Sequence, residues 1–185
     1  IVSNQAGRSN ILSRLEKYGV KIDSKDPKVQ KILDEVKDRE FSGYSYDGAD
    51  ASFELLANRL LGKVPEYLKV KSYNVSVAKS DTIKTKANVV FLIDGKDIEC
   101  DGEGNGPVNA LDNAIRSNFK KVEKYYKYFS DLKLLDYKVR ILNTGTGATT
   151  RVSIESTDKT GKSWFTIGVS QNIIEASFKA LIDSL

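Results

Sequence analysis

The stretch with the clearest capacity for ligand chemistry is ECDGEGNGPVNALDNAI, residues 99–115. Gly102, Gly104 and Gly106 alternate with polar residues, and an amphipathic helical pattern begins at Pro107. Backbone N–H groups at the start of a helix attract anions, and glycines let a ligand approach the backbone closely. The loop therefore indicates a phosphate site, a site for a small molecule with one carboxylate, or a strand-to-helix corner that needs positive φ.

A nucleotide phosphate fits this loop poorly. The glycines follow the spacing GxGxG rather than GxGxxG, and no Lys-Ser or Lys-Thr pair follows them. The preceding pattern is typical of antiparallel strands, and Asp101 and Glu103 would repel a polyanion. A small ligand with one carboxylate fits better, because it needs only a few N–H groups and its ammonium group can pair with nearby acids.

The composition argues against catalysis by this chain. Its 185 residues include no histidine, a single cysteine, Cys100, and no CxxC pair. Histidine is the usual general base and a common metal ligand near neutral pH, so we expect neither a zinc site nor a Ser-His or Cys-His nucleophile. No close pair of carboxylates indicates acid–base catalysis. We therefore expect no catalytic residues, no cofactor and no metal in this chain.

The charge pattern bears on partners and compartment. The 29 basic residues are interspersed among 25 acidic ones, and the resulting net charge of +4 forms no basic cluster, so we expect no nucleic-acid partner. No apolar run reaches the roughly 18 residues of a membrane span, and no signal-peptide pattern opens the chain. One cysteine favours the cytoplasm. Because the chain starts at Ile1 and lacks methionine, we expect a piece of a longer polypeptide.

The first third of the chain shows helical periodicity. Apolar residues recur at helical spacing in three segments, residues 9–19, 26–41 and 51–62. Ser9 is the expected N-cap of the first segment, and Asp26 that of the second. Helices this short are marginal in isolation, so we expect residues 1–65 to form a helical linker subdomain that packs on itself or on a larger body.

From Tyr73 onward, a unit of three strands and one helix occurs twice. The first copy comprises strands 73–77, 87–93 and 97–100 with helix 107–119, and the second comprises strands 137–141, 149–156 and 163–169 with helix 170–185. Gly102 aligns with Gly168 at an offset of 66 residues, and Asn172 with Glu175 predicts a capping box. The predicted fold class is α+β: the helical linker, then two pseudo-symmetric βββα units, about 71–119 and 135–185, in one domain, 66–185.

Six segments of the chain match a known family in sequence and in order. Two come first, GRSNI and GYSYDGADASFELL, and four follow, GEGNGPVNALDNAI, LLDYKVRIL, TRVSIESTD and SWFTIGVSQNIIEASFKALIDSL. The later four resemble the C-terminal regulatory domain of the 2-isopropylmalate synthase and citramalate synthase family. The first two resemble the linker segment of its citramalate synthase branch, so the resemblance covers nearly the whole chain.

This resemblance implies a regulatory rather than a catalytic role. The family places a catalytic TIM barrel with an HxH metal motif upstream of these segments. A divalent metal is therefore expected in that missing domain, and no acyltransferase activity is expected in this chain. The regulatory domain dimerises and binds a branched-chain amino acid as feedback inhibitor. The resemblance thus implies a homodimer that binds isoleucine in a citramalate synthase, which joins acetyl-CoA and pyruvate. The alternatives are a leucine-binding 2-isopropylmalate synthase domain and a purely structural dimerisation module.

Carried over by motif, the expected effector site comprises ten residues: Gly104, Asn105, Gly106, Asn109, Leu134, Asp136, Tyr137, Ile141, Ala148 and Val169. The start of helix 107–119 would receive the effector carboxylate, Asp136 would take the ammonium group, and the last three residues would line an apolar end. Asn109 departs from some leucine-regulated relatives, which carry a small apolar residue there, so the choice between isoleucine and leucine stays open. Core packing explains Tyr137, Ile141 and Val169 equally well.

Overall fold

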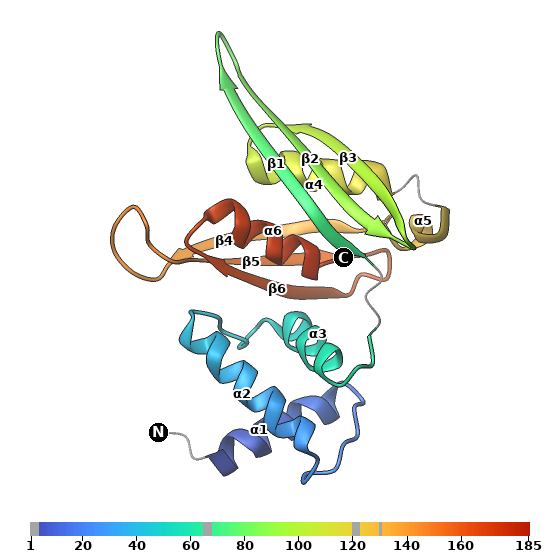
Figure 1. Ribbon diagram of the computed structural model, residues 1–185, viewed down its shortest axis with the longest axis vertical. Helices are drawn as coiled ribbons and strands as arrows, with labels where there is room; N and C mark the ends of the chain where they lie inside the picture. Colours follow the sequence, from blue (N-terminus) through green and yellow to red (C-terminus); the bar gives the residue numbers. More distant parts are fainter. Residues whose placement is uncertain (1–3, 65–67, 120–122, 130) are drawn as a thin grey trace.

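The computed structural model describes residues 4–64, 68–119, 123–129 and 131–185, which form three tiers (Figure 1). The elements are α1 (Asn4–Lys17), α2 (Pro27–Phe41), α3 (Asp50–Leu60), β1 (Lys69–Lys79), β2 (Ile83–Ile93), β3 (Lys96–Gly104), α4 (Pro107–Phe119), α5 (Glu123–Phe129), β4 (Lys133–Ile141), β5 (Thr150–Thr157), β6 (Ser163–Ser170) and α6 (Ile173–Asp183). The predicted α+β class, a helical subdomain plus two βββα units, is confirmed. The expected boundary at 65/66 lies outside the described residues.

Side-chain caps hold the starts of α2 and α6, whereas Ala49 at the start of α3 makes no side-chain cap hydrogen bond. The Asp26 carboxylate accepts the Lys28 N–H at 2.8 Å and caps α2, as predicted. The prediction of Ser9 as the cap of α1 is wrong, because α1 begins at Asn4. Gly7 lies within this helix, and a Cβ there would be 3.0 Å from Leu33 Cδ1 of α2. Close packing against α2 therefore favours a helix that continues through Gly7.

The cap of α6 differs in one detail from the predicted capping box. The Asn172 carboxamide oxygen accepts the N–H groups of Ile174 and Glu175, as expected of an N-cap. The Glu175 carboxylate does not return to the Asn172 N–H, because it accepts the Ser170 hydroxyl at 2.5 Å instead. The Asn172 N–H donates to Ser170 Oγ at 3.1 Å. Ser170 thus completes the cap from the end of β6.

The two sheets have the same topology and share one irregularity in register. Both are antiparallel, in the orders β1-β2-β3 and β4-β5-β6. The first strand of each sheet shifts register at one point, between Val70 and Ser72 in β1 and between Leu134 and Asp136 in β4. These positions correspond in the two copies, so the pseudo-symmetry extends to the β-bulges.

Glycines at matching positions let each helix lie directly on its sheet. A Cβ at Gly102 would collide with the backbone N of Ala114 in α4, and one at Gly168 with the carbonyl oxygen of Ala176 in α6. A Cβ at Gly104 would likewise meet the backbone of α4 at 2.5 Å. None of these three glycines has φ in the left-handed region. Close strand–helix packing, rather than backbone freedom, therefore requires Gly102 and Gly104.

The two units share one apolar core. Buried side chains of both sheets and both long helices belong to the same cluster. Tyr73 of β1 packs against Phe178 of α6 with ring centroids 4.4 Å apart, and α4 contacts α6. Each unit therefore covers apolar surface that the other would expose, as the repeat predicts.

The helical subdomain packs on the second unit, although it precedes the first unit in the chain. Figure 1 shows α1 to α3 beside the β4–β6 sheet, with the β1–β3 sheet at the opposite end. α3 contacts β6 and α6, and Ile167 of β6 belongs to the apolar core of the helical subdomain. In the first unit the corresponding residue is Asp101, whose charge would be costly to bury there. The residue at this position thus favours docking on the second unit.

Among the helices that the structure describes, none combines the length and apolar character needed to cross a membrane.

We predict that Gly168→Ala lowers the free energy of unfolding by about 3 kcal/mol, because the methyl group must push α6 away from β6. The matched control is Gly147→Ala, where, apart from the glycine and its two chain neighbours, no described residue has an atom within 4 Å of the added Cβ and φ is outside the left-handed region. Its effect should stay within about 0.5 kcal/mol. Urea denaturation measures both variants, and equal midpoints would contradict the packing argument.

Candidate functional site

The ten expected effector residues fall into two groups on different units. Four lie where β3 leads into α4, and six lie on β4, the β4–β5 turn and β6. The start of α4 and the end of β4 both lie on the left-hand side of Figure 1. The groups therefore share one side of the molecule but belong to separate sheets.

Gly106 is the last residue before α4. Its carbonyl oxygen accepts the Ala110 N–H at 2.9 Å, the first hydrogen bond of the helix. Apart from Gly106 itself and its two chain neighbours, no described residue has an atom within 4 Å of a Cβ built on Gly106, and its φ is not in the left-handed region. The sequence left open a strand-to-helix corner that needs positive φ, and Gly106 does not have this conformation. The backbone of Gly106 is therefore open to an approaching group without an unusual φ.

Asn105 and Asn109 of the same loop bind each other. The Asn105 N–H donates to Asn109 Oδ1 at 3.1 Å. One N–H group of the loop is therefore satisfied by the chain itself. Asn109 thus has a structural role that a small apolar residue could not supply.

Two further asparagines of α4 extend this pattern along the free edge of β3. Asn113 Nδ2 donates to the Glu103 carbonyl at 2.9 Å. Asn118 Nδ2 donates to the Asp101 carbonyl at 3.1 Å. A strand edge whose carbonyl groups already have partners is a poor template for another strand. These side chains therefore protect the edge of the first sheet.

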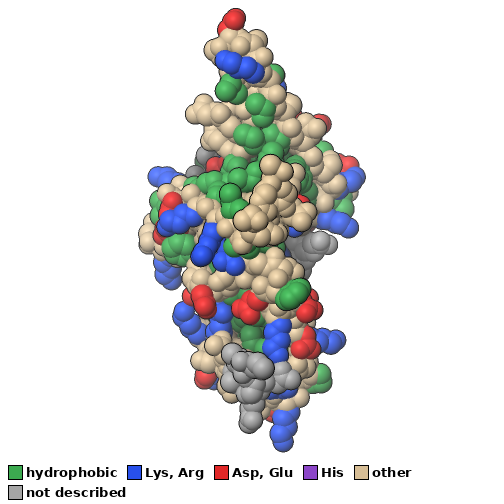
Figure 2. Space-filling model, turned by 90° about the vertical axis from the view of Figure 1, so that its left-hand side faces the viewer, with side chains coloured by type: hydrophobic (Ala, Val, Ile, Leu, Met, Phe, Trp, Pro, Cys, Tyr) green, Lys and Arg blue, Asp and Glu red, His purple; other side chains and the backbone are tan. Residues whose placement is uncertain are grey.

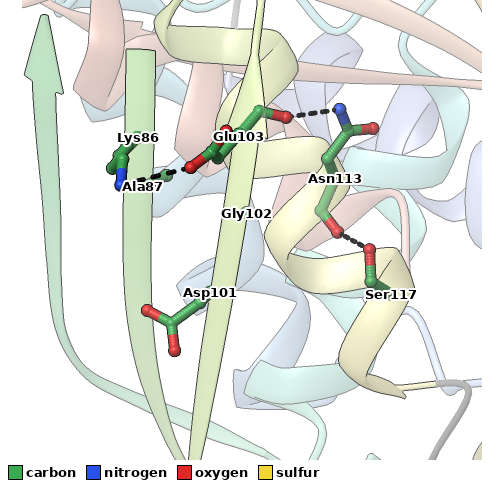
Figure 3. A pocket seen from close by; sticks show the side chains of 7 residues that line it. All are labelled: Lys86, Ala87, Asp101, Gly102, Glu103, Asn113 and Ser117. Atoms are coloured by element: carbon green, nitrogen blue, oxygen red, sulfur yellow. Dashed lines mark hydrogen bonds and ion pairs between the residues drawn. The ribbon is translucent and has the colours of Figure 1, made fainter. Parts of the chain in front are cut away.

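A hollow of about 540 Å³ lies beside these asparagines (Figure 3). It is lined by Lys86, Ala87, Asp101, Gly102, Glu103, Asn113 and Ser117. Lys86 Nζ lies 3.2 Å from Glu103 Oε1 across it, and the Ser117 hydroxyl donates to the Asn113 carbonyl. None of the ten expected effector residues is among the lining residues. Most of its lining residues carry polar side chains.

Tyr137 faces α6 and is anchored there. Its hydroxyl lies 2.8 Å from Ser177 Oγ. Because the Ser177 hydroxyl donates to the Ile173 carbonyl at 2.6 Å, the Tyr137 hydroxyl is the donor to Ser177. Tyr137 also packs against the shared core, so it links β4 to the first half of α6.

Asp136 points to the opposite side of the sheet from Tyr137, since neighbouring residues of a strand alternate. Lys138 Nζ at 2.6 Å holds the pKa of the Asp136 carboxyl below its usual range, and the Tyr137 N–H donates to Asp136 Oδ1 at 2.8 Å. The carboxylate is therefore ionised at neutral pH and already paired. An effector ammonium group would have to compete with Lys138 for it.

The three residues expected at the apolar end lie in different surroundings. Ile141 is 67% exposed, whereas Ala148 and Val169 are buried. The strand register places Ile141 on the α6 side of its sheet and Val169 on the other side. There a Cβ at Gly43 of the helical subdomain would lie 3.4 Å from Val169 Cγ1. Within one chain, Ile141 and Val169 therefore do not line a common wall.

Polar residues that join the helical subdomain to the second unit gave no signal in the sequence. The Ser52 hydroxyl donates to Asp183 Oδ2 at 3.0 Å across 131 residues of chain. Arg151 Nε donates to the Gly43 carbonyl at 2.6 Å. Periodicity and capping patterns describe only neighbouring residues, so they contain no information about such pairs.

Across the described ranges, no group of three or more His, Cys, Asp or Glu side chains is placed to hold a metal ion.

Comparisons with known proteins identify relatives of the chain. A family model described as the LeuA allosteric (dimerisation) domain matches residues 47–185. The (R)-citramalate synthases of Geobacter sulfurreducens and Aquifex aeolicus are 45% and 44% identical to it over the whole chain, which covers 35% of each relative. A 2-isopropylmalate synthase of Clostridium acetobutylicum is 33% identical over 71% of the chain and 21% of the relative. The chain thus spans about a third of the length of these citramalate synthases.

We predict that Tyr137→Phe and Ser177→Ala each lower the free energy of unfolding by about 1 kcal/mol, because each removes the same partly buried hydrogen bond. The double variant should cost less than the sum of the two single changes, with a coupling of about 0.5–1.5 kcal/mol. Chemical denaturation of the four proteins measures this cycle. Fully additive effects would mean that the two hydroxyl groups do not bind each other.

Proposed function

Because the chain belongs to the LeuA allosteric (dimerisation) domain family, we propose that it is the effector-binding and dimerising part of a citramalate synthase. The observation that favours this branch is sequence identity. The chain is 45% identical over its whole length to a citramalate synthase, but only 33% identical, over 71% of its length, to a 2-isopropylmalate synthase. The proposed parent enzyme works in the cytoplasm and transfers an acetyl group from acetyl-CoA to pyruvate. Its catalytic residues and a divalent metal would lie in the part that this chain does not cover.

A second copy of the chain is the proposed partner of an apolar face formed by both units. Large apolar side chains are exposed on the β1–β2 hairpin, at the end of β4 and at the start of α6: Val77, Ile83, Val139, Ile141 and Ile173. These segments lie on the left in Figure 1, and Figure 2, which views that side, shows hydrophobic side chains extending from the hairpin to the middle of the molecule. Exposed apolar surface of this kind marks protein interfaces, and a two-fold dimer buries the same patch of both copies.

The effector, proposed as isoleucine, would lie beside this interface. The two groups of expected site residues belong to different units and border the same side, so a second copy could bring the α4 loop of one chain to β4 of the other. The open backbone at Gly106 and the N–H groups that begin α4 would receive the carboxylate. Ile141, exposed in one chain, would then cover the effector side chain.

The energetics of such a site set its selectivity. Full burial of an isoleucine side chain contributes roughly 1.5–3 kcal/mol. Discrimination against valine depends on about one methylene group, which is worth roughly 1–3 kcal/mol. Isoleucine should therefore bind best, with weaker binding of valine. Leucine as the preferred effector would instead point to the 2-isopropylmalate synthase branch, and the absence of any binding to a purely structural dimerisation module.

We predict that Gly106→Ala weakens isoleucine binding by about tenfold or more, equal to about 1.4 kcal/mol, because the added methyl group occupies the space proposed for the carboxylate. The variant should fold as stably as the parent chain, since that space is open and φ is ordinary. Titration calorimetry with isoleucine, leucine and valine measures the affinities, with Gly147→Ala as control. If Gly106→Ala binds isoleucine with unchanged affinity, the loop does not bind the effector carboxylate and serves only as a strand-to-helix connection.

We also predict that Val77→Lys shifts the chain from dimer to monomer, because it places a charge within the proposed apolar interface. Val77 is 56% exposed in the single chain, so the change should leave its fold intact. Phe41→Lys is the control, because Phe41 is 95% exposed and belongs to the helical subdomain rather than to either unit. Sedimentation equilibrium at tens of micromolar measures both. A dimeric Val77→Lys variant would place the interface elsewhere.

A further inference from the structure

The sequence contains one Asn–Gly pair, Asn105–Gly106. It lies in the connection between β3, which ends at Gly104, and α4, which begins at Pro107. Asparagine is one of the chemically labile residues. It is most labile before glycine, because glycine has no side chain to hinder the attack of its backbone nitrogen on the preceding carboxamide. The pair is therefore a candidate for covalent modification.

The side chain of Asn105 is exposed and unrestrained. No described residue forms a hydrogen bond with its carboxamide, because the contact with Asn109 uses the Asn105 backbone N–H. The next asparagines of the chain differ in this respect. Asn109 and Asn113 both use their carboxamide groups in hydrogen bonds to the backbone. The Asn105 carboxamide alone among these three is thus free to turn toward the nitrogen of Gly106.

The backbone nitrogen of Gly106 is equally accessible. The Gly106 carbonyl accepts the Ala110 N–H, but no described residue accepts a hydrogen bond from the Gly106 N–H. Apart from its chain neighbours, no described residue has an atom within 4 Å of a Cβ built on Gly106. A nitrogen that loses its proton here becomes an anion beside the N-terminal end of α4, where the helix dipole favours negative charge. Neither reacting group therefore has to break a hydrogen bond first.

Asn143 in the β4–β5 turn provides an internal contrast. It is exposed like Asn105, but its carboxamide oxygen accepts the Thr149 N–H. The residue that follows it is Thr144, whose branched side chain hinders attack by its backbone nitrogen. Exposure of an asparagine is thus combined with a free carboxamide and an unhindered neighbour at Asn105 but not at Asn143.

We propose that Asn105 deamidates spontaneously in the folded protein, and that the product weakens effector binding at the start of α4. The Gly106 nitrogen forms a bond to Asn105 Cγ, the bond between Cγ and Nδ2 breaks, and the amide group leaves as ammonia with the proton of the Gly106 N–H. A water molecule then opens the cyclic imide at either of its carbonyl groups. The products are aspartate and isoaspartate at position 105, and neither step needs an oxidant or a reductant.

The consequence for effector binding rests on the proposed function. Both products carry a carboxylate beside Gly106 and the N–H groups that are proposed to receive the effector carboxylate. Two like charges at this separation repel each other. Isoaspartate also inserts a methylene group into the main chain before the Gly106 nitrogen, which displaces the loop. Deamidation therefore both repels the effector and alters the backbone that would bind it.

Peptide mass spectrometry of the 185-residue chain, after incubation at neutral and at mildly alkaline pH, tests the modification. The peptide with Asn105 should gain the mass difference between an amide and an acid, and it should separate into aspartate and isoaspartate forms. Conversion should be faster at the higher pH, because the attacking nitrogen must lose its proton. Asn105→Gln should stay unmodified, because its longer side chain would have to close a larger ring. The peptide with Asn143 should also stay unmodified.

The chain unfolded in guanidinium chloride is the reference for this measurement. Conversion of Asn105 in the unfolded chain but not in the folded chain would overturn the proposal, because the loop would then keep the two reacting groups apart. Equal conversion at Asn105 and Asn143 in the folded chain would overturn the argument from the free carboxamide and the unhindered nitrogen.

Titration calorimetry of Asn105→Asp with isoleucine tests the consequence. The affinity should fall by about tenfold or more, because the variant carries the charge of the product. The matched control is Asn74→Asp, which makes the same charge change at an exposed residue of β1. Its neighbours Tyr73 and Val75 pack against the core, so the Asn74 side chain lies on the face of the sheet away from α4. It should bind isoleucine like the parent chain.

The two parts of the proposal fail separately. An isoleucine affinity of Asn105→Asp equal to that of the parent chain would overturn the effect on the effector. If the parent chain binds no isoleucine, the effector proposal fails and this effect fails with it. The mass measurement does not depend on isoleucine, so it decides the deamidation of Asn105 in either case.

Discussion

The close approach of α4 and α6 to the backbone of their sheets is the constraint on which the rest of the structure depends. Gly102 and Gly168 leave no room for a side chain, and alanines of the facing helices fill the contact. Because each helix lies so near an edge strand, its polar side chains reach the carbonyl groups of that strand. Asn113 of α4 donates to the Glu103 carbonyl, and Lys179 of α6 donates to the Val169 carbonyl at 3.3 Å. The same approach brings the two helices into one shared core.

The two βββα units present outer surfaces at equivalent positions, and these surfaces have different contacts. On the second unit, Ile167 and Asp183 receive the helical subdomain. On the first unit, charged and hydroxyl groups line a polar hollow at the same place. Burial of an apolar side chain is favourable, whereas burial of an unpaired charge is costly, so the residues at these two positions favour docking on the second unit.

The candidate site could be predicted only in part from the sequence. The loop at Gly106 does open toward the solvent at a helix start, but Gly104 belongs to helix packing, and the Asn109 side chain binds Asn105. Asp136 is paired with Lys138, a neighbour only two residues away in the chain. In the proposed dimer the two groups of site residues would meet across the contact with a second copy, which no pattern within one chain describes.

By itself, the sequence determined the elements and their order, because periodicity, helix caps and turn residues act between neighbours along the chain. Asp26 and Asn172 cap their helices through N–H groups two or three residues away, and the repeat at 66 residues predicted two like units. Only the tertiary structure decided that the helical subdomain docks on the second unit and that Ser52 meets Asp183. Such contacts join residues more than 100 positions apart, and they depend on the packing of α6 on β6, which places their partners.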